Sequence, residues 1–117
     1  MRELKEPGAH WISDQDVEKA LDFLRDKAVE IANAKAEKIK AEHMLKAVKA
    51  LVMSEHATLP VGAQEREAYA SKQYRDAVFE IGKTTREYEL LHALRVAAEA
   101  KIETWRTMNA NWTAMKL

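Results

Sequence analysis

The sequence predicts an all-α fold: a long antiparallel helical hairpin, similar to a coiled coil, with a short helix after the turn, assembled into a multi-helix oligomer. Hydrophobic residues make up 47% of the 117 residues and charged residues 32%, a balance typical of a folded, helix-rich chain. Only three glycines and two prolines are present, which indicates few turns. Apolar side chains recur three and four positions apart along two long stretches, the period of one helix face.

The chain has the size of one domain, and we expect an N-terminal arm at residues 1–12 followed by a single helical-hairpin domain at residues 13–117. The arm contains a proline and a glycine and has little periodicity. Trp11 and Ile12 could pack as a hydrophobic staple before the first helix.

The first long helix is expected to begin at Ser13 and to end near Glu55. The Ser13 hydroxyl can accept hydrogen bonds from free backbone N–H groups, and Asp14 and Asp16 place negative charge at the positive end of the helix dipole. No glycine or proline interrupts this stretch. Its predicted apolar face contains Val17, Leu21, Leu24, Ala28, Ile31, Met44, Leu45, Val48, Leu51 and Val52.

The chain is expected to turn within residues 56–63, because Pro60 cannot continue a helix and Gly62 tolerates unusual backbone angles. A short helix follows, and Ser71 can end it and cap the next helix. The second long helix is predicted from Lys72 to about Met108, with a tail that frays or packs on a neighbour. Gly82 inside this helix costs about 1 kcal/mol relative to alanine, which indicates a close helix contact or a bend.

The sign of the charge alternates along the chain, with net charges of −3, +3, −2 and +2 in residues 1–30, 31–50, 51–90 and 91–117. Folding back at Pro60 would place each basic block beside an acidic one. Complementary charges beside an apolar seam are how paired helices select partner and orientation. Self-association into a bundle would bury the apolar surface that two helices of this length leave exposed.

The stretch "AEKIKAEHMLKAVKA" poses the main functional question. Its lysines, Lys38, Lys40, Lys46 and Lys49, could hold phosphate groups or could lie against another helix. Because the hairpin would set them beside acidic residues, we favour the second interpretation.

No motif for catalysis or for binding a metal or cofactor is found, and we expect a protein that is not an enzyme. The absence of cysteine excludes thiolate metal sites and cysteine nucleophiles. Glu89 and His92 have the Glu-x-x-His spacing of di-iron bundles, but no second copy of this spacing exists, so a helix-surface pair is the better interpretation.

The candidate binding residues lie near the C-terminus, where indole rings alternate with positive charge. Such a combination suits the stacking and phosphate contacts of a single-strand binder, and tryptophan and arginine are equally the favoured anchors of protein interfaces. The candidates are Trp105, Arg106, Trp112, Lys116, Lys101 and Arg95.

Two stretches, "EREAYASKQY" and "AAEAKIETWR", resemble small helical proteins of tailed phages and prophages, over residues 30–107. The positions that carry the resemblance are Glu65, Arg66, Glu67, Tyr69, Tyr74, Trp105 and Arg106. It implies an accessory protein of phage DNA recombination or replication. From the candidate residues near the C-terminus we expect such a protein to be non-catalytic and to bind a protein partner, and single-stranded DNA could be a further ligand. An inhibitor of a host defence protein or of its signal is the alternative. No apolar run of membrane-spanning length is present, so we expect a cytoplasmic protein with no membrane partner.

Overall fold

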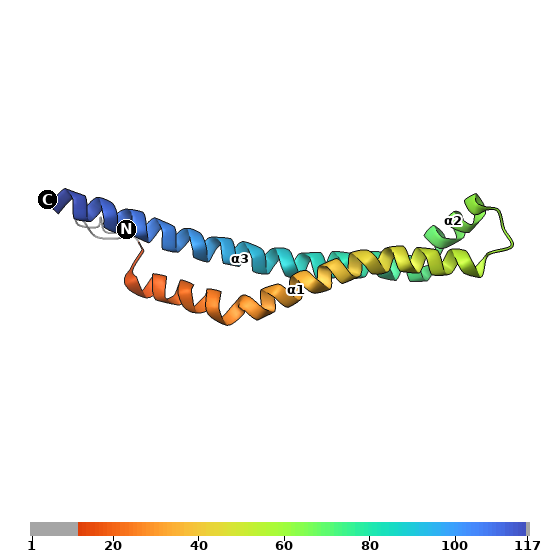
Figure 1. The fold of residues 1–117 in the computed structure, drawn as a ribbon, viewed down its shortest axis with the longest axis horizontal. Coiled ribbons are helices and arrows are strands. Elements are labelled where there is room, and N and C mark those ends of the chain that lie inside the picture. The colour runs from red at the N-terminus through yellow and green to blue at the C-terminus, as the bar shows by residue number, and fades with distance from the viewer. Residues whose placement is uncertain (1–11, 117) are drawn as a thin grey trace, which may run out of the picture. The chain divides into compact units, whose positions relative to one another are not determined.

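Helices form every element in the part of the chain that the structure, a computed structural model, describes, which is residues 12–116. Helix α1 spans Asp14–Glu55, α2 spans Val61–Ala70 and α3 spans Lys72–Lys116 (Figure 1). The predicted all-α helical hairpin with a short helix after its turn is therefore confirmed. Most of the predicted arm, including Trp11 of the expected staple, lies outside the described residues.

Contacts divide the chain into two compact units, each built from segments of α1 and α3. The described part of unit 1 comes from Met1–Val29 and His92–Leu117, and unit 2 is Glu30–Leu91. Unit 2 therefore contains the turn and all of α2. Figure 1 shows the segments of α1 and α3 side by side.

The N-cap expected at Ser13 is present at the start of α1, and Asp16 completes it as a capping box. The Asp16 backbone N–H donates to the Ser13 hydroxyl at 3.1 Å, and the Ser13 backbone N–H donates to the Asp16 carboxylate at 3.0 Å. Two backbone donors that the helix leaves free are thus satisfied reciprocally. The bond from the Ser13 backbone N–H, followed by that from its side chain, lowers the pKa of the Asp16 carboxyl.

This lowered pKa predicts acid sensitivity at the N-terminus of α1. A carboxyl whose pKa is lower in the folded state stabilises the fold above its unfolded pKa, and the contribution is lost as pH falls through the folded value. We expect the protection of the Asp16 and Val17 amides against exchange, relative to the unfolded chain at the same pH, to fall below about pH 4. Hydrogen exchange measured by NMR checks this, and Asp16→Asn, which has no carboxyl group to titrate, should remove the pH dependence. Protection factors that stay the same at acid pH would contradict it.

The turn between α1 and α2 ends at Pro60, earlier than expected from residues 56–63. Helix α2 already includes Val61 and Gly62, because proline suits the start of a helix, where its missing N–H costs nothing. The Gln64 backbone N–H donates to the Pro60 carbonyl at 3.0 Å, and its side-chain amide donates to the Leu59 carbonyl at 2.8 Å. The turn is held by these bonds.

Ser71 ends α2 and caps α3, as predicted. Its backbone N–H and its hydroxyl both donate to the Ala68 carbonyl, at 3.1 and 2.6 Å. Its hydroxyl oxygen accepts the Tyr74 backbone N–H at 3.1 Å. One hydroxyl therefore connects the two helices.

Ser71→Ala should lower the free energy of unfolding by about 1 kcal/mol, because it removes an N-cap and a bond to the end of α2 together. Chemical denaturation followed by circular dichroism measures this change. Ser54→Ala is the matched control, since the exposed Ser54 hydroxyl only donates to the Leu51 carbonyl within α1. An equal loss in both variants would mean that the cap has no special role.

Helix α3 continues to Lys116, so the predicted end near Met108 was wrong. No glycine or proline follows Gly82, and half-buried Asn109 and Trp112 keep the last turns beside other side chains. The helix also runs through Gly82 without interruption. A Cβ atom there would meet nothing within 4 Å, so the close contact expected at Gly82 is not made within the described chain.

Burial follows a heptad pattern in both long helices. Along one side of each helix, buried and half-buried positions recur three and four residues apart, and we call the positions of this line the seam positions. In α1 they are Val17, Ala20, Leu24, Lys27, Ile31, Ala34, Lys38, Ala41, Leu45, Val48 and Val52. In α3 they are Tyr74, Ala77, Ile81, Thr84, Tyr88, Leu91, Arg95, Ala98, Ile102, Trp105, Asn109 and Trp112.

This seam differs from the predicted apolar face of α1, since Leu21, Ala28, Met44 and Leu51 are exposed. Polar Lys27 and Lys38 occupy seam positions in their place. The core is thin: among the described residues no large side chain is less than 2% exposed. Apolar surface beyond the seam is therefore left open to partners.

Candidate functional site

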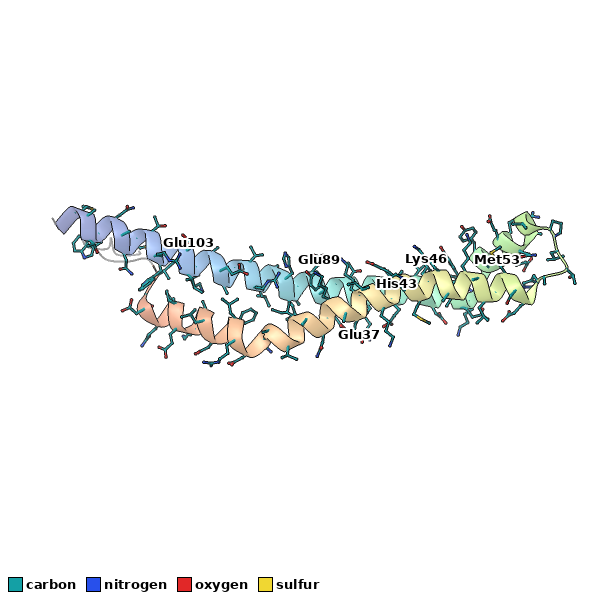
Figure 2. All side chains as sticks on the ribbon, in the orientation of Figure 1. Glu37, His43, Lys46, Met53, Glu89 and Glu103 are labelled. Atoms are coloured by element: carbon teal, nitrogen blue, oxygen red, sulfur yellow. The ribbon has the colours of Figure 1, made fainter. Side chains whose placement is uncertain are left out.

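Two of the four lysines in the stretch at residues 36–50 lie against aromatic rings of other helices. The Lys38 ammonium lies 5.2 Å from the Tyr88 ring centre and 3.8 Å from the Glu89 carboxylate. The Lys49 ammonium lies 4.8 Å from the Tyr69 ring centre. These two lysines face helices, as favoured from the sequence, whereas Lys46 is exposed (Figure 2).

Tyr69 joins all three helices of unit 2. Its ring receives Lys49 from α1 and meets Tyr74 of α3 edge to face, with ring centres 5.2 Å apart. The hydrogen bond with Tyr69 raises the pKa of Lys49. Cation–π and edge-to-face contacts thus tie α2 to both long helices.

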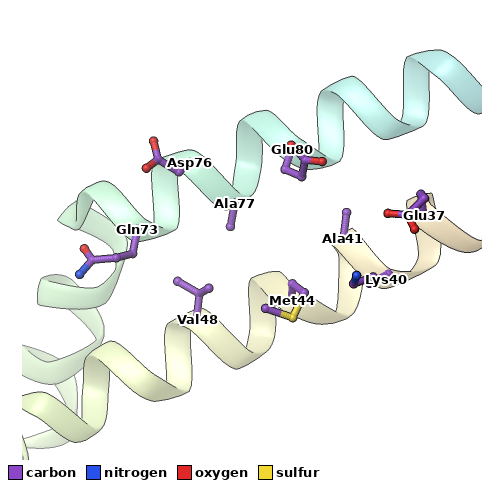
Figure 3. A pocket seen from close by; sticks show the side chains of 9 residues that line it. All are labelled: Glu37, Lys40, Ala41, Met44, Val48, Gln73, Asp76, Ala77 and Glu80. Carbon is purple, nitrogen blue, oxygen red and sulfur yellow. The ribbon is translucent and has the colours of Figure 1, made fainter.

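A groove lies along one side of the seam in unit 2, and we call it the seam groove. Its volume is about 360 Å³. In Figure 3, Ala41 and Val48 point from α1 toward α3, and Ala77 points back from α3. The two alanines are short, so the helices leave a hollow between them. Its lining is Glu37, Lys40, Ala41, Met44, Val48, Gln73, Asp76, Ala77 and Glu80.

The two sides of the seam groove carry different charges. Asp76 and Glu80 give the α3 side two carboxylates, and Lys40 gives the α1 side an ammonium group beside Glu37. Met44 stands at the edge with 49% of its surface exposed. The groove thus combines an apolar floor, one protruding flexible side chain, an α3 side with two carboxylates and an α1 side with one ammonium group and one carboxylate.

A second surface lies on α3 away from the seam, and we call it the outer α3 face. It consists of Val78, Phe79, Gly82, Lys83, Arg86, Glu87 and Leu90, which line an open hollow of about 580 Å³. Phe79 is 77% exposed and Leu90 is 60% exposed. Gly82, which has no side chain, lies between them. Large apolar side chains this exposed are the usual mark of a contact surface when they cluster.

Of the six residues expected to bind a partner or nucleic acid, three lie at seam positions and three lie outside the seam. Trp105, Trp112 and Arg95 occupy seam positions, and the Trp105 indole N–H donates to the Asp14 carboxylate at 3.0 Å. Arg95 lies 3.5 Å from the Glu99 carboxylate and 3.1 Å from a ring nitrogen of His92.

The other three candidates lie outside the seam. Lys101 and Arg106 are exposed, and the Arg106 guanidinium lies 3.3 Å from Glu103 on the same helix. Lys116 lies in the last turn of α3, and its side chain is outside the described residues. Lys101 and Arg106 are therefore the two described candidates most open to a ligand.

Glu89 and His92 form contacts with different residues, Lys38 and Arg95. Over residues 12–116, no group of three or more histidine, aspartate or glutamate side chains could hold a metal ion. None of the described helices contains an apolar stretch of the length that a lipid bilayer requires.

The outer α3 face was not predicted from the sequence. Phe79, Gly82, Arg86 and Leu90 are spaced three, four and four apart, which is a second helical stripe on the side opposite the seam. The signal was present, but the glycine and the arginine interrupt its apolar character. Without a structure, the stripe through Tyr74, Ile81 and Tyr88 dominates the pattern.

No protein-family model, no curated protein and no solved structure matches this chain. The helical hairpin and its two surfaces are therefore the basis for assigning a function.

Proposed function

We propose that this protein is a non-catalytic helical binding protein that holds a protein partner on the outer α3 face. The observation that carries the proposal is Phe79, an aromatic side chain 77% exposed beside Gly82 and Leu90. Exposing it to water is unfavourable, and burying it in a partner removes that cost. Aromatic and arginine side chains are the common anchors of protein interfaces, and Arg86 stands on the same face.

The charges of this face define the partner's chemistry. Lys83 and Arg86 flank the apolar stripe with positive charge, against one carboxylate from Glu87. A partner helix with apolar residues on one face and acidic residues beside them would match both features. We therefore take an acidic amphipathic helix as the ligand.

The biological setting is a further part of the proposal. The resemblance of residues 65–74 and 97–106 to small phage proteins supports a cytoplasmic accessory role in DNA recombination or replication, and it supports nothing narrower. An inhibitor of a host defence protein would use the same exposed face. The identity of the captured partner distinguishes these two roles.

Single-stranded DNA is the competing ligand. The exposed Lys101 and Arg106 near the end of α3 favour it, since positive side chains open to solvent can contact phosphates. The indole groups of Trp105 and Trp112 are half-buried at seam positions, which limits their faces for base stacking.

The experiment measures fluorescence anisotropy with three labelled probes. These are a synthetic helical peptide with leucine on one face and glutamate beside it, a matched peptide with lysine in place of glutamate, and a single-stranded oligonucleotide. We expect the glutamate peptide to bind. Phe79→Ala combined with Leu90→Ala should weaken binding by roughly tenfold or more. Val61→Ala on α2, also at an exposed position, is the matched control.

The Phe79→Ala, Leu90→Ala double variant and the Val61→Ala control change exposed side chains only. Each should therefore leave the free energy of unfolding within about 0.5 kcal/mol of that of the original chain, so that lost binding would not reflect unfolding. Equal binding of both peptides, or binding unaffected by the double substitution, would refute the outer α3 face as the site. Oligonucleotide binding that weakens steeply as salt is added, and that is also weakened by the combined substitutions Lys101→Gln and Arg106→Gln, would support single-stranded DNA as the ligand instead of the acidic helix.

A further inference from the structure

We infer that a second copy of this chain docks on the seam groove, so that the unit 2 segments of two hairpins form a four-helix bundle. This contact lies on a different surface from the outer α3 face and goes beyond the partner binding proposed there. The groove is bordered by both long helices. In charge and in shape, its α1 side can pair with the α3 side of a second groove, and its α3 side with the α1 side of that groove.

The charges of the groove match those of a second groove. On the α1 side Lys40 supplies an ammonium group, with the Glu37 carboxylate one turn before it, and on the α3 side stand Asp76 and Glu80. Among the described residues Lys40 forms no ion pair within 4.0 Å, and Asp76 contacts Lys72 of its own helix at 3.6 Å. A copy that lays its α1 over this α3 brings its Lys40 to the two carboxylates.

The shapes of the two sides match as well. Met44 protrudes on the α1 side and is 49% exposed, whereas Ala77 leaves a hollow on the α3 side. Figure 3 shows Ala41 beside Glu80, and Val48 beside the turn that carries Gln73 and Ala77. A methionine is flexible enough to fill such a hollow in a partner.

Charge also selects the symmetry of the pair. A two-fold axis parallel to the helices places α1 of each copy over α3 of the other at the same level, which sets Lys40 near Glu80 and Met44 near Ala77. An axis perpendicular to the helices would set α1 on α1 and place the carboxylates of the two α3 helices together. Only the first arrangement brings Lys40 to the carboxylates of α3 and keeps the α3 carboxylates of the two copies apart, and the four helices then form an antiparallel bundle.

Burial supports the need for this contact. The seam of unit 2 is built at this groove from Ala41 and Ala77, and Leu51 beyond it is 63% exposed. Two helices cannot enclose these side chains, whereas the usual bundle of four helices can.

The experiment measures the mass of the full chain by light scattering. We expect twice the 13.4 kDa of one chain. Lys40→Glu alone, and Asp76→Lys with Glu80→Lys in another chain, should each raise the dimer Kd by roughly tenfold or more. Glu42→Lys and Lys46→Glu, at exposed positions of α1 outside the groove, are the matched controls and should leave the mass unchanged.

Mixing the two groove variants is the decisive step. In the mixture, the glutamate that replaces Lys40 in one chain faces the lysines that replace Asp76 and Glu80 in the other. The unchanged groups of the two chains also face each other, so both contacts across the mixed dimer are attractive. Within each single chain the altered charges still repel, so recovery of the dimer on mixing can come only from contact between copies. Circular dichroism checks that both variants stay helical.

A monomeric original chain, or dimers unaffected by the groove substitutions, would overturn the inference, and so would the absence of recovery on mixing. Peptide binding at Phe79 is measured separately and does not depend on the groove. Failure of one proposal is therefore distinguishable from failure of the other.

Discussion

Ile31→Ala is expected to lower the free energy of unfolding by about 2–4 kcal/mol, a large effect for so thin a core. Ile31 is 5% exposed and is the bulkiest fully apolar side chain among the buried residues of unit 2. Truncation removes the free energy of burying the side chain and leaves a cavity. The helices can close such a cavity only if the neighbouring seam positions shift out of their heptad packing.

Val29→Ala is the matched control for this prediction. Val29 precedes Ile31 by two positions on the same helix but is 71% exposed, so its loss should change the free energy of unfolding by about 0.5 kcal/mol or less. Urea denaturation followed by circular dichroism measures both variants. Similar losses in the two would show that the seam positions do not carry the stability of the hairpin.

The sequence was sufficient for the helices and the turn because local chemistry determines them. Ser13, Pro60 and Ser71 act through their own side chains and their nearest backbone groups, and the structure places them at helix ends as predicted. The α3 terminus was predicted too early because Asn109 and Asn111 have poor helix propensity. Propensity is a weak guide, and seam contacts at Asn109 and Trp112 outweigh it.

The face of α1 was harder to predict than its length. Leu21 and Ala28 extend an apolar stripe that the folded hairpin does not bury, whereas Lys27 and Lys38 occupy seam positions. A lysine can lie along a seam because its methylene groups pack while its ammonium reaches the edge. For Lys38 the edge is supplied by Tyr88 and Glu89, two residues that only the folded chain brings near.

The candidate binding residues were also difficult to predict, because their surroundings depend on which residues the folded chain brings near. Indole and guanidinium groups near the C-terminus suggested a binding surface, yet Trp105 lies at a seam position and donates to Asp14, which is remote in sequence. A pattern of residue types does not show which side of a helix meets its neighbour. Phe79 and Leu90 became candidates only when the seam was known to lie on the other side of α3.

Ala68→Leu is expected to destabilise the chain by about 1–3 kcal/mol through overpacking. Ala68 is 0% exposed, the most buried of the described residues, and it lies on α2 next to Tyr69. A leucine there has no space unless α2 moves away from the long helices. Such a movement would pull Tyr69 from Tyr74 and from Lys49.

Ala70→Leu tests whether this effect comes from burial or from a leucine in α2 as such. Ala70 is exposed two positions away on the same helix, so a leucine there should change the free energy of unfolding by about 0.5 kcal/mol or less. NMR can follow the Tyr69 and Tyr74 ring contacts in both variants. We expect Ala68→Leu to lose them and Ala70→Leu to keep them, because α2 stays bound only while residue 68 remains small. If Ala68→Leu kept the ring contacts and an unchanged unfolding midpoint, α2 would have room for the larger side chain. The small size of Ala68 would then not be what holds α2 against the long helices.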